Sequence, residues 1–309
     1  MFSIFNNFFA ILQTDFLGEL AALTAACLWA ISSVIYGRIG QRIPPLELNI
    51  LKGAIAIALL VCTLLVQKST FSDVTPTTLG LLLLSGVLGI GIGDTAFFFA
   101  LNYLGARRAL LMETLSPPLA AILALIFLQE QLSMSAWCGI LLTILGVAWV
   151  VTERVPNLGE RHTRIQRGVG FGILAAIALA SGAVISQIVL TTSNISPLWA
   201  ALLRLCGGVL VLLPWGWQRQ HHRRFEFKSI NAKIMVAICI AAFAGTYLGI
   251  WLQQVAVKFA VVGVALTLSN TSPLFVIPIA VCLGERISLR AILGVFVALS
   301  GIAVLLLSR

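Results

Sequence analysis

Long apolar runs recur along the whole of this 309-residue chain. An α-helix rises 1.5 Å per residue, so a run of about 20 apolar residues crosses the hydrocarbon core of a bilayer. The period-two alternation typical of transmembrane β-barrels is absent. The pattern predicts ten transmembrane helices, at residues 17–38, 46–67, 77–102, 107–128, 134–152, 168–191, 197–217, 233–256, 260–283 and 288–307.

Composition supports an all-α integral membrane protein. Hydrophobic residues make up 60% of the chain and charged residues 10%, whereas soluble domains have about 25% charged residues. The net charge of +9 is explained by basic loops next to a lipid bilayer, so no nucleic-acid partner is expected. The six cysteines all lie in apolar runs without metal-ligand spacing, and neither a metal nor a cofactor is expected.

The distribution of basic residues predicts the orientation. The odd-numbered connections hold Arg38, Arg42, Arg107, Arg108, Arg154, Arg161, Arg164, Arg167, Arg219, Arg223, Arg224, Lys228, Lys233, Arg286 and Arg290. The opposite side holds Lys68, Lys258 and Arg309. Because Lys and Arg accumulate in cytoplasmic loops, both termini are predicted to be non-cytoplasmic, in a protein of the plasma (inner) membrane.

The chain contains an internal repeat. The segment from Pro118 matches the segment from Pro273 at an offset of 155 residues, with shared Pro, Glu-x-x-Ser and Gly spacing. The expected units are an N-terminal segment 1–16, a first five-helix repeat 17–152, a basic linker 153–167 and a second repeat 168–309. Five is odd, so the two repeats must insert in opposite orientations, an arrangement found in transporters with a site near the bilayer midplane.

Three ionisable residues of the first repeat are predicted to lie at similar depth. Lys52, Asp94 and Glu113 each fall about two helical turns from the predicted cytoplasmic boundary. Charges there cost about 2.5–3.5 kcal/mol each on insertion scales, so they usually face a partner or a cavity. One reading is a fixed ion pair that only joins helices. In the other, two carboxylates share one lysine, and Asp94 or Glu113 couples proton movement to transport.

The second repeat lacks these acids, because Gly249 and Leu268 occupy the matching positions. Arg204, which matches Lys52, therefore has no predicted acidic partner. It either binds backbone carbonyls or attracts an anionic group of a substrate. Gln253, Gln254 and Asn270 are further candidates for substrate contacts.

Two tryptophans and two prolines complete the candidates. Trp29 and Trp251 lie in mid-span, where they either pack or form an aromatic wall suited to apolar or cationic substrates. Pro118 and Pro273 are predicted to bend their helices near the bilayer middle, since proline removes a backbone hydrogen bond.

The sequence resembles the ten-helix, EamA-like members of the drug/metabolite transporter superfamily. The resemblance rests on ALTAACLWAIS, the basic residues Lys52 and Arg204, ALNYLGARRALLMETLSPPLAAILALIFLQEQLS and SNTSPLFVIPIAVCLGERIS, and covers nearly the whole chain. It implies a secondary transporter of small organic metabolites, often an exporter and sometimes of amino acids. Many members are expected to have cytoplasmic termini, the reverse of what the loop charges predict here.

Two other classes of function are weaker. A membrane enzyme lacks support because the chain has no HExxH, GxSxG or metal-spaced carboxylate cluster, and no Walker motif suggests ATP-driven pumping. A non-transporting receptor or scaffold explains neither the buried charges nor the inverted repeat. The substrate, the direction of flux and the coupling ion are left open. A monomer is sufficient to build the cavity, and a dimer is compatible with it.

The predicted orientation can be tested with reporter fusions at Arg309. We expect a fusion that reports cytoplasmic exposure to be silent and one that reports external exposure to be active. A control fusion in the basic connection at Arg164 should give the opposite result. Cytoplasmic signal at Arg309 would overturn the orientation.

Overall fold

The computed structural model describes residues 17–67, 74–127, 133–151, 161–222, 231–259, 268–284 and 288–307. Throughout these residues the regular structure is helical. The elements are α2 (Leu17–Ile39), α3 (Pro45–Val66), α4 (Pro76–Gly86), η1 (Val87–Asp94), α5 (Thr95–Leu104), α6 (Ala106–Glu113), α7 (Ser116–Phe127), α8 (Met134–Val151), α9 (Arg161–Thr192), α10 (Pro197–His222), α11 (Ala232–Ala241), η3 (Ala242–Leu248), α12 (Gly249–Phe259), α14 (Ser272–Cys282) and α15 (Leu289–Leu307).

Six continuous spans in the described residues are long and apolar enough to cross a membrane, and α8, α14 and α15 are shorter apolar helices. The prediction of an all-helical membrane protein is confirmed, whereas the count of ten crossings stays a prediction. The predicted N-terminal segment 1–16, most of the linker 153–167 and the start of the span 260–283 lie outside the described residues.

The sequence marks several helix starts. Pro45 and Pro76 occupy the first turns of α3 and α4, where a missing backbone N–H costs nothing. The Thr75 hydroxyl accepts a hydrogen bond from the Thr78 backbone N–H, and the Asn231 side chain accepts one from the Lys233 backbone N–H. These caps fix where α4 and α11 begin, because they satisfy N–H groups that the first helical turn leaves free.

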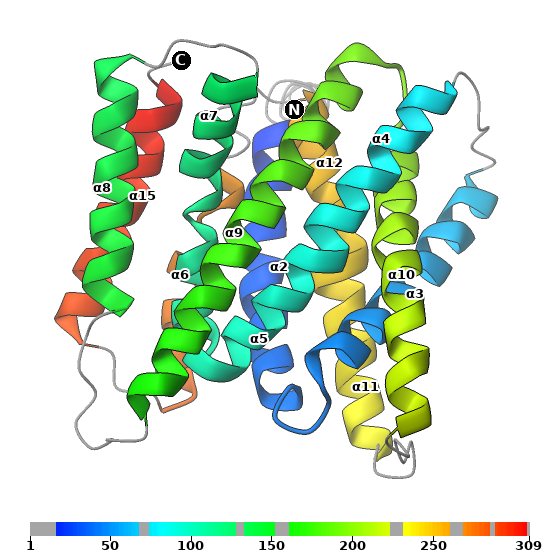
Figure 1. Ribbon diagram of the computed structural model, residues 1–309, viewed down its shortest axis with the longest axis horizontal. Coiled ribbons are helices and arrows are strands. Elements are labelled where there is room, and N and C mark those ends of the chain that lie inside the picture. The colour runs from blue at the N-terminus through cyan, green and yellow to red at the C-terminus, as the bar shows by residue number, and fades with distance from the viewer. Residues whose placement is uncertain are drawn as a thin grey trace, which may run out of the picture.

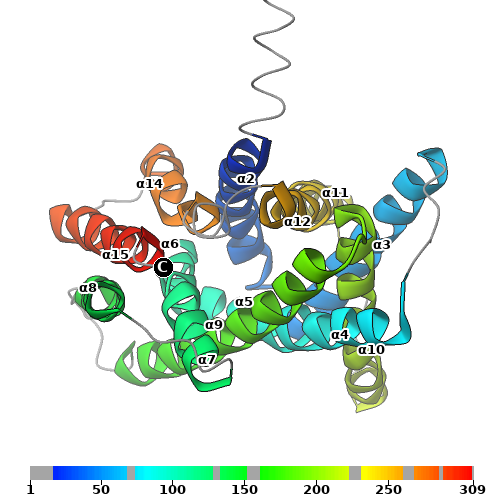
Figure 2. The same ribbon diagram turned by 90° about the horizontal axis from the view of Figure 1, so that it is seen from above.

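The two repeats interlock through their first helices. The first helix of repeat one, α2, packs against α11, η3 and α12 of repeat two, while α9 of repeat two packs against α4, η1 and α5 of repeat one. The pairs α3 with α10 and α8 with α15 also join matching helices of the two repeats (Figures 1 and 2). The packing therefore has the exchange of partners expected of an inverted repeat, and the core of the bundle is made by both halves.

The third span of each repeat contains a π-helical segment. In repeat one it is η1, between α4 and α5, and in repeat two it is η3, between α11 and α12. The two segments begin at Val87 and Ala242, which are separated by the same offset of 155 residues as the repeats. π-Helical turns are rare and occur frequently at functional sites. Their shared register shows that the irregularity belongs to the repeated unit.

The fourth span of repeat one is interrupted where a bend was predicted. Helix α6 ends at Glu113, Thr114 and Leu115 form a turn, and α7 begins at Ser116. Pro118 therefore lies in the first turn of a new helix, where proline is well tolerated. In repeat two, Pro273 likewise follows the start of α14, after a turn at Asn270 and Thr271. Breaks preceding both prolines replace the predicted bends.

The last helices of the repeats, α8 and α15, approach closely through glycine. A Cβ atom added to Gly146 would lie 2.5 Å from the Ala298 backbone nitrogen and 2.8 Å from the Gly294 carbonyl oxygen. A Cβ atom added to Gly301 would likewise overlap Thr143. Gly146 and Gly301 match in the repeat, so small residues at equivalent positions let two backbones touch.

We expect Gly146→Ala to lower the apparent melting temperature of the detergent-solubilised protein, because overpacking costs about 1–3 kcal/mol. Gly170→Ala is the matched control, since nothing lies within 4 Å of a Cβ atom there. Alanine favours a helix over glycine by about 0.5–1 kcal/mol, so the control should be unchanged or more stable. Equal melting temperatures for the two variants would show that the close α8–α15 approach is not required.

Candidate functional site

A cavity of about 160 Å³ lies inside the bundle and is lined by both repeats. It is smaller than the sites of about 300–1,000 Å³ that hold drug-sized ligands. Its charged and polar lining residues are Ser32, Ser33, Tyr36, Lys52, Asp94, Glu113, Ser116, Gln187, Arg204, Thr246, Gln253, Ser269, Asn270 and Ser272. Polar groups are costly in a bilayer unless they face a partner or a cavity, so this concentration marks a candidate binding site.

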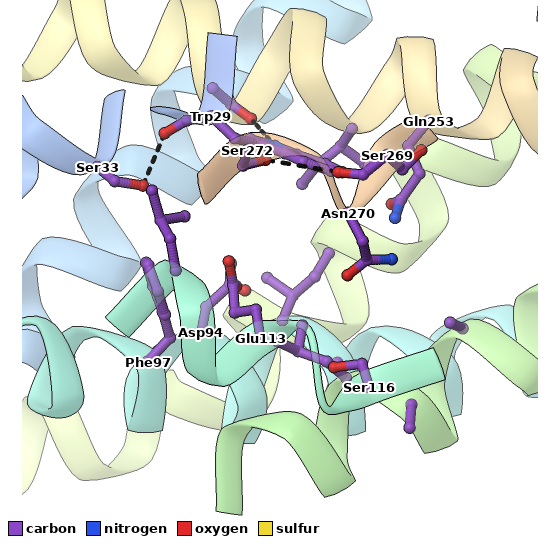
Figure 3. A pocket seen from close by; sticks show the side chains of 18 of the residues that line it. Trp29, Ser33, Asp94, Phe97, Glu113, Ser116, Gln253, Ser269, Asn270 and Ser272 are labelled. Atoms are coloured by element: carbon purple, nitrogen blue, oxygen red, sulfur yellow. Dashed lines mark hydrogen bonds between the residues drawn. The ribbon is translucent and has the colours of Figure 1, made fainter. Parts of the chain in front are cut away.

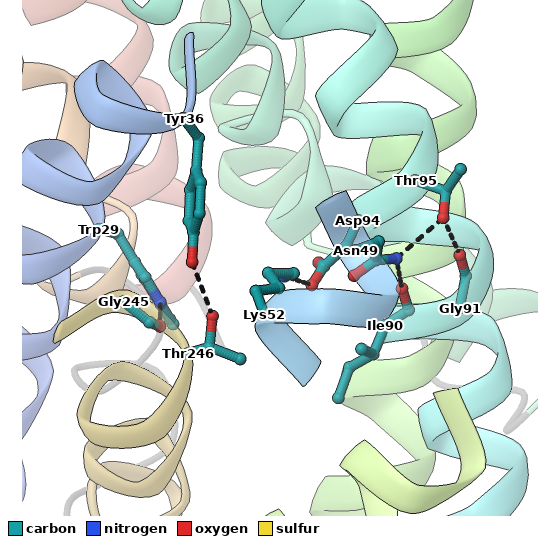
Figure 4. A network of polar contacts seen from close by, with 10 residues as sticks. All are labelled: Trp29, Tyr36, Asn49, Lys52, Ile90, Gly91, Asp94, Thr95, Gly245 and Thr246. Atoms are coloured by element: carbon teal, nitrogen blue, oxygen red, sulfur yellow. Dashed lines mark hydrogen bonds and ion pairs between the residues drawn. The ribbon is translucent and has the colours of Figure 1, made fainter. Parts of the chain in front are cut away.

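The Lys52 ammonium of α3 forms an ion pair with the Asp94 carboxylate at the end of η1 (Figure 4). One helical turn earlier on α3, the Asn49 side chain donates hydrogen bonds to the Ile90 carbonyl and to the Thr95 hydroxyl, each 2.8 Å long. Thr95 in turn donates to the carbonyl of Gly91 over 2.6 Å. Helix α3 therefore contacts η1 in two ways: Lys52 pairs with the Asp94 carboxylate, and the Asn49 side chain binds the Ile90 carbonyl.

Glu113 lies at the end of α6 and lines the same cavity. Its carboxylate points into the open space, opposite Asn270 and Ser269 (Figure 3). Lys52 and Asp94 both act on it electrostatically, yet within the described chain it makes no hydrogen bond or ion pair. Lys52 is thus paired with one carboxylate, and the other faces the cavity without a cation of its own.

Arg204 of α10 lines the cavity and is 6% exposed. Among the described residues its side chain has no hydrogen-bond or ion-pair partner, and its buried Nε atom is unsatisfied. No contact between the guanidinium and a backbone carbonyl occurs among the described residues. Lys52, which occupies the matching position in repeat one, contacts the Asp94 carboxylate directly. Asp94 acts on Arg204 electrostatically, without contact.

The second π-helical segment is held by α2 of the other repeat. The Trp29 indole N–H donates to the Gly245 carbonyl over 2.9 Å, and the Ser32 hydroxyl donates to the Ala241 carbonyl over 3.2 Å. The Tyr36 hydroxyl lies 3.3 Å from the Thr246 hydroxyl (Figure 4). One face of α2 therefore satisfies η3 across the boundary between the repeats.

The helix breaks also line the cavity. Ser116 and Pro117 come from the start of α7. Ser269 and Asn270 come from the segment just before α14, and Ser272 is the first residue of α14 (Figure 3). The Ser116 hydroxyl is buried and has no partner in the described part of the chain. Discontinuous helices beside a central site are a recurring construction in secondary transporters.

Most of the sequence-derived candidates meet at this cavity. Lining residues include Trp29, Lys52, Asp94, Glu113, Arg204, Asn270 and Pro273. Three candidates do not. Trp251 packs on Tyr247 with ring centroids 5.9 Å apart. Gln254 is buried and accepts a 2.9 Å hydrogen bond from Ser186. The cavity is lined by Pro117 and not by its neighbour Pro118. The packing alternative considered for Trp251 is the one observed.

Polar contributors that sequence reasoning did not single out include Tyr36, Asn49 and Ser116. Asn49 lies three residues before Lys52, on the same helix face, and this spacing was a usable signal. The glycine-rich run GVLGIGIGD ahead of Asp94 was a signal for irregular backbone. Tyr36 carried no signal beyond polarity.

The apolar spans, the interlocked repeats and the internal polar cavity define a multi-pass membrane protein of the transporter class. The sequence profile of the EamA-like transporter family matches residues 16–152 and 166–307, one copy on each repeat, and the chain belongs to this family. The predicted resemblance is thereby confirmed, and the family is one of transporters rather than enzymes.

Two curated proteins and one solved structure are similar to this chain. An uncharacterized transporter of Archaeoglobus fulgidus is 24% identical over 93% of this chain and 97% of its own length. Protein LicB of Haemophilus influenzae is 28% identical over 62% of this chain and 65% of its own length, so the match leaves about a third of LicB uncovered. A solved crystal structure shares the fold with a TM-score of 0.67, 17% identity, and coverage of 94% of this chain and 97% of its own.

The hold on η3 can be tested by Trp29→Phe, which keeps an aromatic ring and removes the donor. We expect a lower apparent melting temperature in detergent, because a buried carbonyl that loses its partner costs about 1–3 kcal/mol. Trp215→Phe is the matched control, since Trp215 is an exposed residue of α10. Equal effects of the two changes would argue against a holding role for the Trp29 hydrogen bond.

Proposed function

We propose that the protein is a secondary transporter that moves a small organic metabolite, an amino acid or a related compound, by alternating access. The observation that carries this proposal is one polar cavity of about 160 Å³ built from both repeats inside an apolar bundle. A site at the boundary of two inverted repeats opens to either side when one repeat rocks against the other. Export is the direction to test first, as the family resemblance suggests.

We further propose that transport is coupled to protons through Glu113. Asp94 is in contact with Lys52, which gives its charge a fixed partner. Glu113 faces the cavity without one, so the charges of the three residues balance when one carboxylate carries a proton. The ion pair thus separates the two candidate acids: Asp94 holds the helices together and Glu113 exchanges the proton.

A receptor or scaffold is the second candidate function. The ionisable residues that line a cavity inside the bundle argue against a scaffold, because protein docking needs an exposed surface rather than buried ionisable groups. The two functions differ in one measurable property, since a receptor binds its ligand and does not move it across a bilayer.

The test is flux in proteoliposomes loaded with an isotope-labelled metabolite extract, with and without an imposed pH gradient. We expect saturable release of at least one metabolite, faster under the gradient. Glu113→Gln should abolish the response to the gradient while leaving exchange without a gradient. Asp94→Asn should impair both, because it leaves Lys52 buried without its partner.

Glu19→Gln is the matched control, because Glu19 lies in the first turn of α2 and does not line the cavity. It should retain the gradient response. Absence of saturable flux for the whole extract would remove the transporter proposal. An intact gradient response in Glu113→Gln would remove the coupling proposal alone.

A further inference from the structure

We propose that Arg204 is the anion anchor of the cavity and that it binds a carboxylate group of the transported metabolite. The inference rests on the proposed transport function and specifies its substrate class. Its basis is a guanidinium that lines the cavity, is 94% buried and has no partner within the described residues.

The buried N–H donors of Arg204 are unfavourable unless an acceptor binds them. A guanidinium carries five N–H donors, stays protonated in proteins, and matches a carboxylate with two parallel hydrogen bonds. In this cavity its donors meet no carboxylate and no carbonyl of the described chain. A buried charge without a partner is strongly unfavourable, so a bound anion that accepts hydrogen bonds from the guanidinium would lower this free-energy cost.

Two glycines lie next to Arg204, one in α4 and one in η1. A Cβ atom on Gly86 would overlap the Arg204 backbone carbonyl, so α4 and α10 are in direct contact at this point. A Cβ atom on Gly89 would lie 3.3 Å from Nη2 of the guanidinium. Glycine at both positions therefore lets the arginine reach the cavity beside η1 instead of being covered by a side chain.

The other donors at the cavity are few or already engaged. The Lys52 ammonium is paired with Asp94. The first turns of α7 and α14 contain Pro117, Pro118 and Pro273, which have no backbone N–H to offer. Arg204 is thus the free cationic donor in the described lining, and recognition of an anion falls to it.

The charges favour a monoanion over a phosphate dianion. With Asp94 and Glu113 ionised, the two carboxylates balance Lys52 and Arg204. When Glu113 is protonated the cavity carries one excess positive charge, which one carboxylate neutralises. A dianion would leave an excess negative charge beside Asp94, where the low dielectric strengthens repulsion.

The test uses the same proteoliposomes with unlabelled competitors. These are propionate, L-alanine, L-leucine and L-glutamine, each beside its amide, and inorganic phosphate. We expect at least one carboxylate to inhibit release of labelled metabolites at a concentration at least about tenfold lower than its amide, the factor that corresponds to loss of one charge-assisted contact. Arg204→Gln should raise that concentration at least about tenfold, and Arg204→Lys should raise it less.

Arg167→Gln is the matched control, because Arg167 is exposed near the start of α9, and it should leave inhibition unchanged. The ligand-free melting temperature separates binding from structure. Arg204→Gln removes an unpaired buried charge and should leave it unchanged or raise it. A drop of more than about 4 °C would indicate a structural role and overturn the proposal.

Two results on the carboxylates would also overturn it: inhibition by the amides at the same concentrations as the acids, or no inhibition by any carboxylate while other metabolites are released. Unchanged inhibition in Arg204→Gln would overturn it as well. So would stronger inhibition by phosphate than by every carboxylate. Each of these leaves the transporter proposal standing. Absence of release for the entire extract removes the transporter proposal and this one together.

Discussion

The ion pair between Lys52 and Asp94 is the interaction on which the centre of the bundle depends. The hydrocarbon core offers no water to satisfy polar groups, so each must find a partner within the protein. Lys52 meets this requirement by binding the residue that ends η1, and Asn49 beside it binds two groups in the same region. The ion pair and the π-helical backbone are therefore linked, because α3 carries the lysine and also stabilises η1.

The repeats share this construction and differ in its chemistry. Both third spans contain π-helical segments in matching register, and the fourth helical segments of both repeats begin after a turn beside the cavity. In repeat one the segment is held by α3 of the same repeat, whereas in repeat two it is held by Trp29 and Ser32 of α2, across the repeat boundary. Arg204, at the position that Lys52 occupies in repeat one, is left without a comparable partner. The two repeats therefore share the backbone arrangement and differ in how their buried charges are paired.

The helices and much of the cavity lining could be predicted from the sequence, because polar and charged groups are costly in the hydrocarbon core of a bilayer. Apolar runs define the spans, and ionisable residues inside them point to a cavity or a partner, which located Lys52, Asp94, Glu113 and Arg204. Hydropathy does not distinguish an α-helix from a π-helix, so η1 and η3 were not predicted.

That omission bears on the direction in which the candidates on α12 face. A π-helical turn bonds residue i to i+5 instead of i+4 and so rotates every later side chain around the helix. Trp251 and Gln254 follow η3, and both lie outside the cavity lining, whereas Gln253 faces the cavity. Trp29 lies in α2, which is a regular α-helix throughout its described length, and it lines the cavity. Without knowledge of the local period, the sequence gives the depth of a residue and not the direction in which it faces.

Charge balance connects the two residues that carry the functional proposals. Removing an ion from water to a low-dielectric interior is costly, so an enclosed site favours occupants that bring its net charge to zero. Lys52 and Asp94 already cancel, which leaves Glu113 and Arg204 to set the sum. A proton on Glu113 removes a negative charge and a carboxylate at Arg204 supplies one. If both bind, each lowers the electrostatic cost of the other, and a coupling free energy of this kind is reciprocal. Proton and anion binding would therefore be linked through the net charge of the cavity, without direct contact between the two groups.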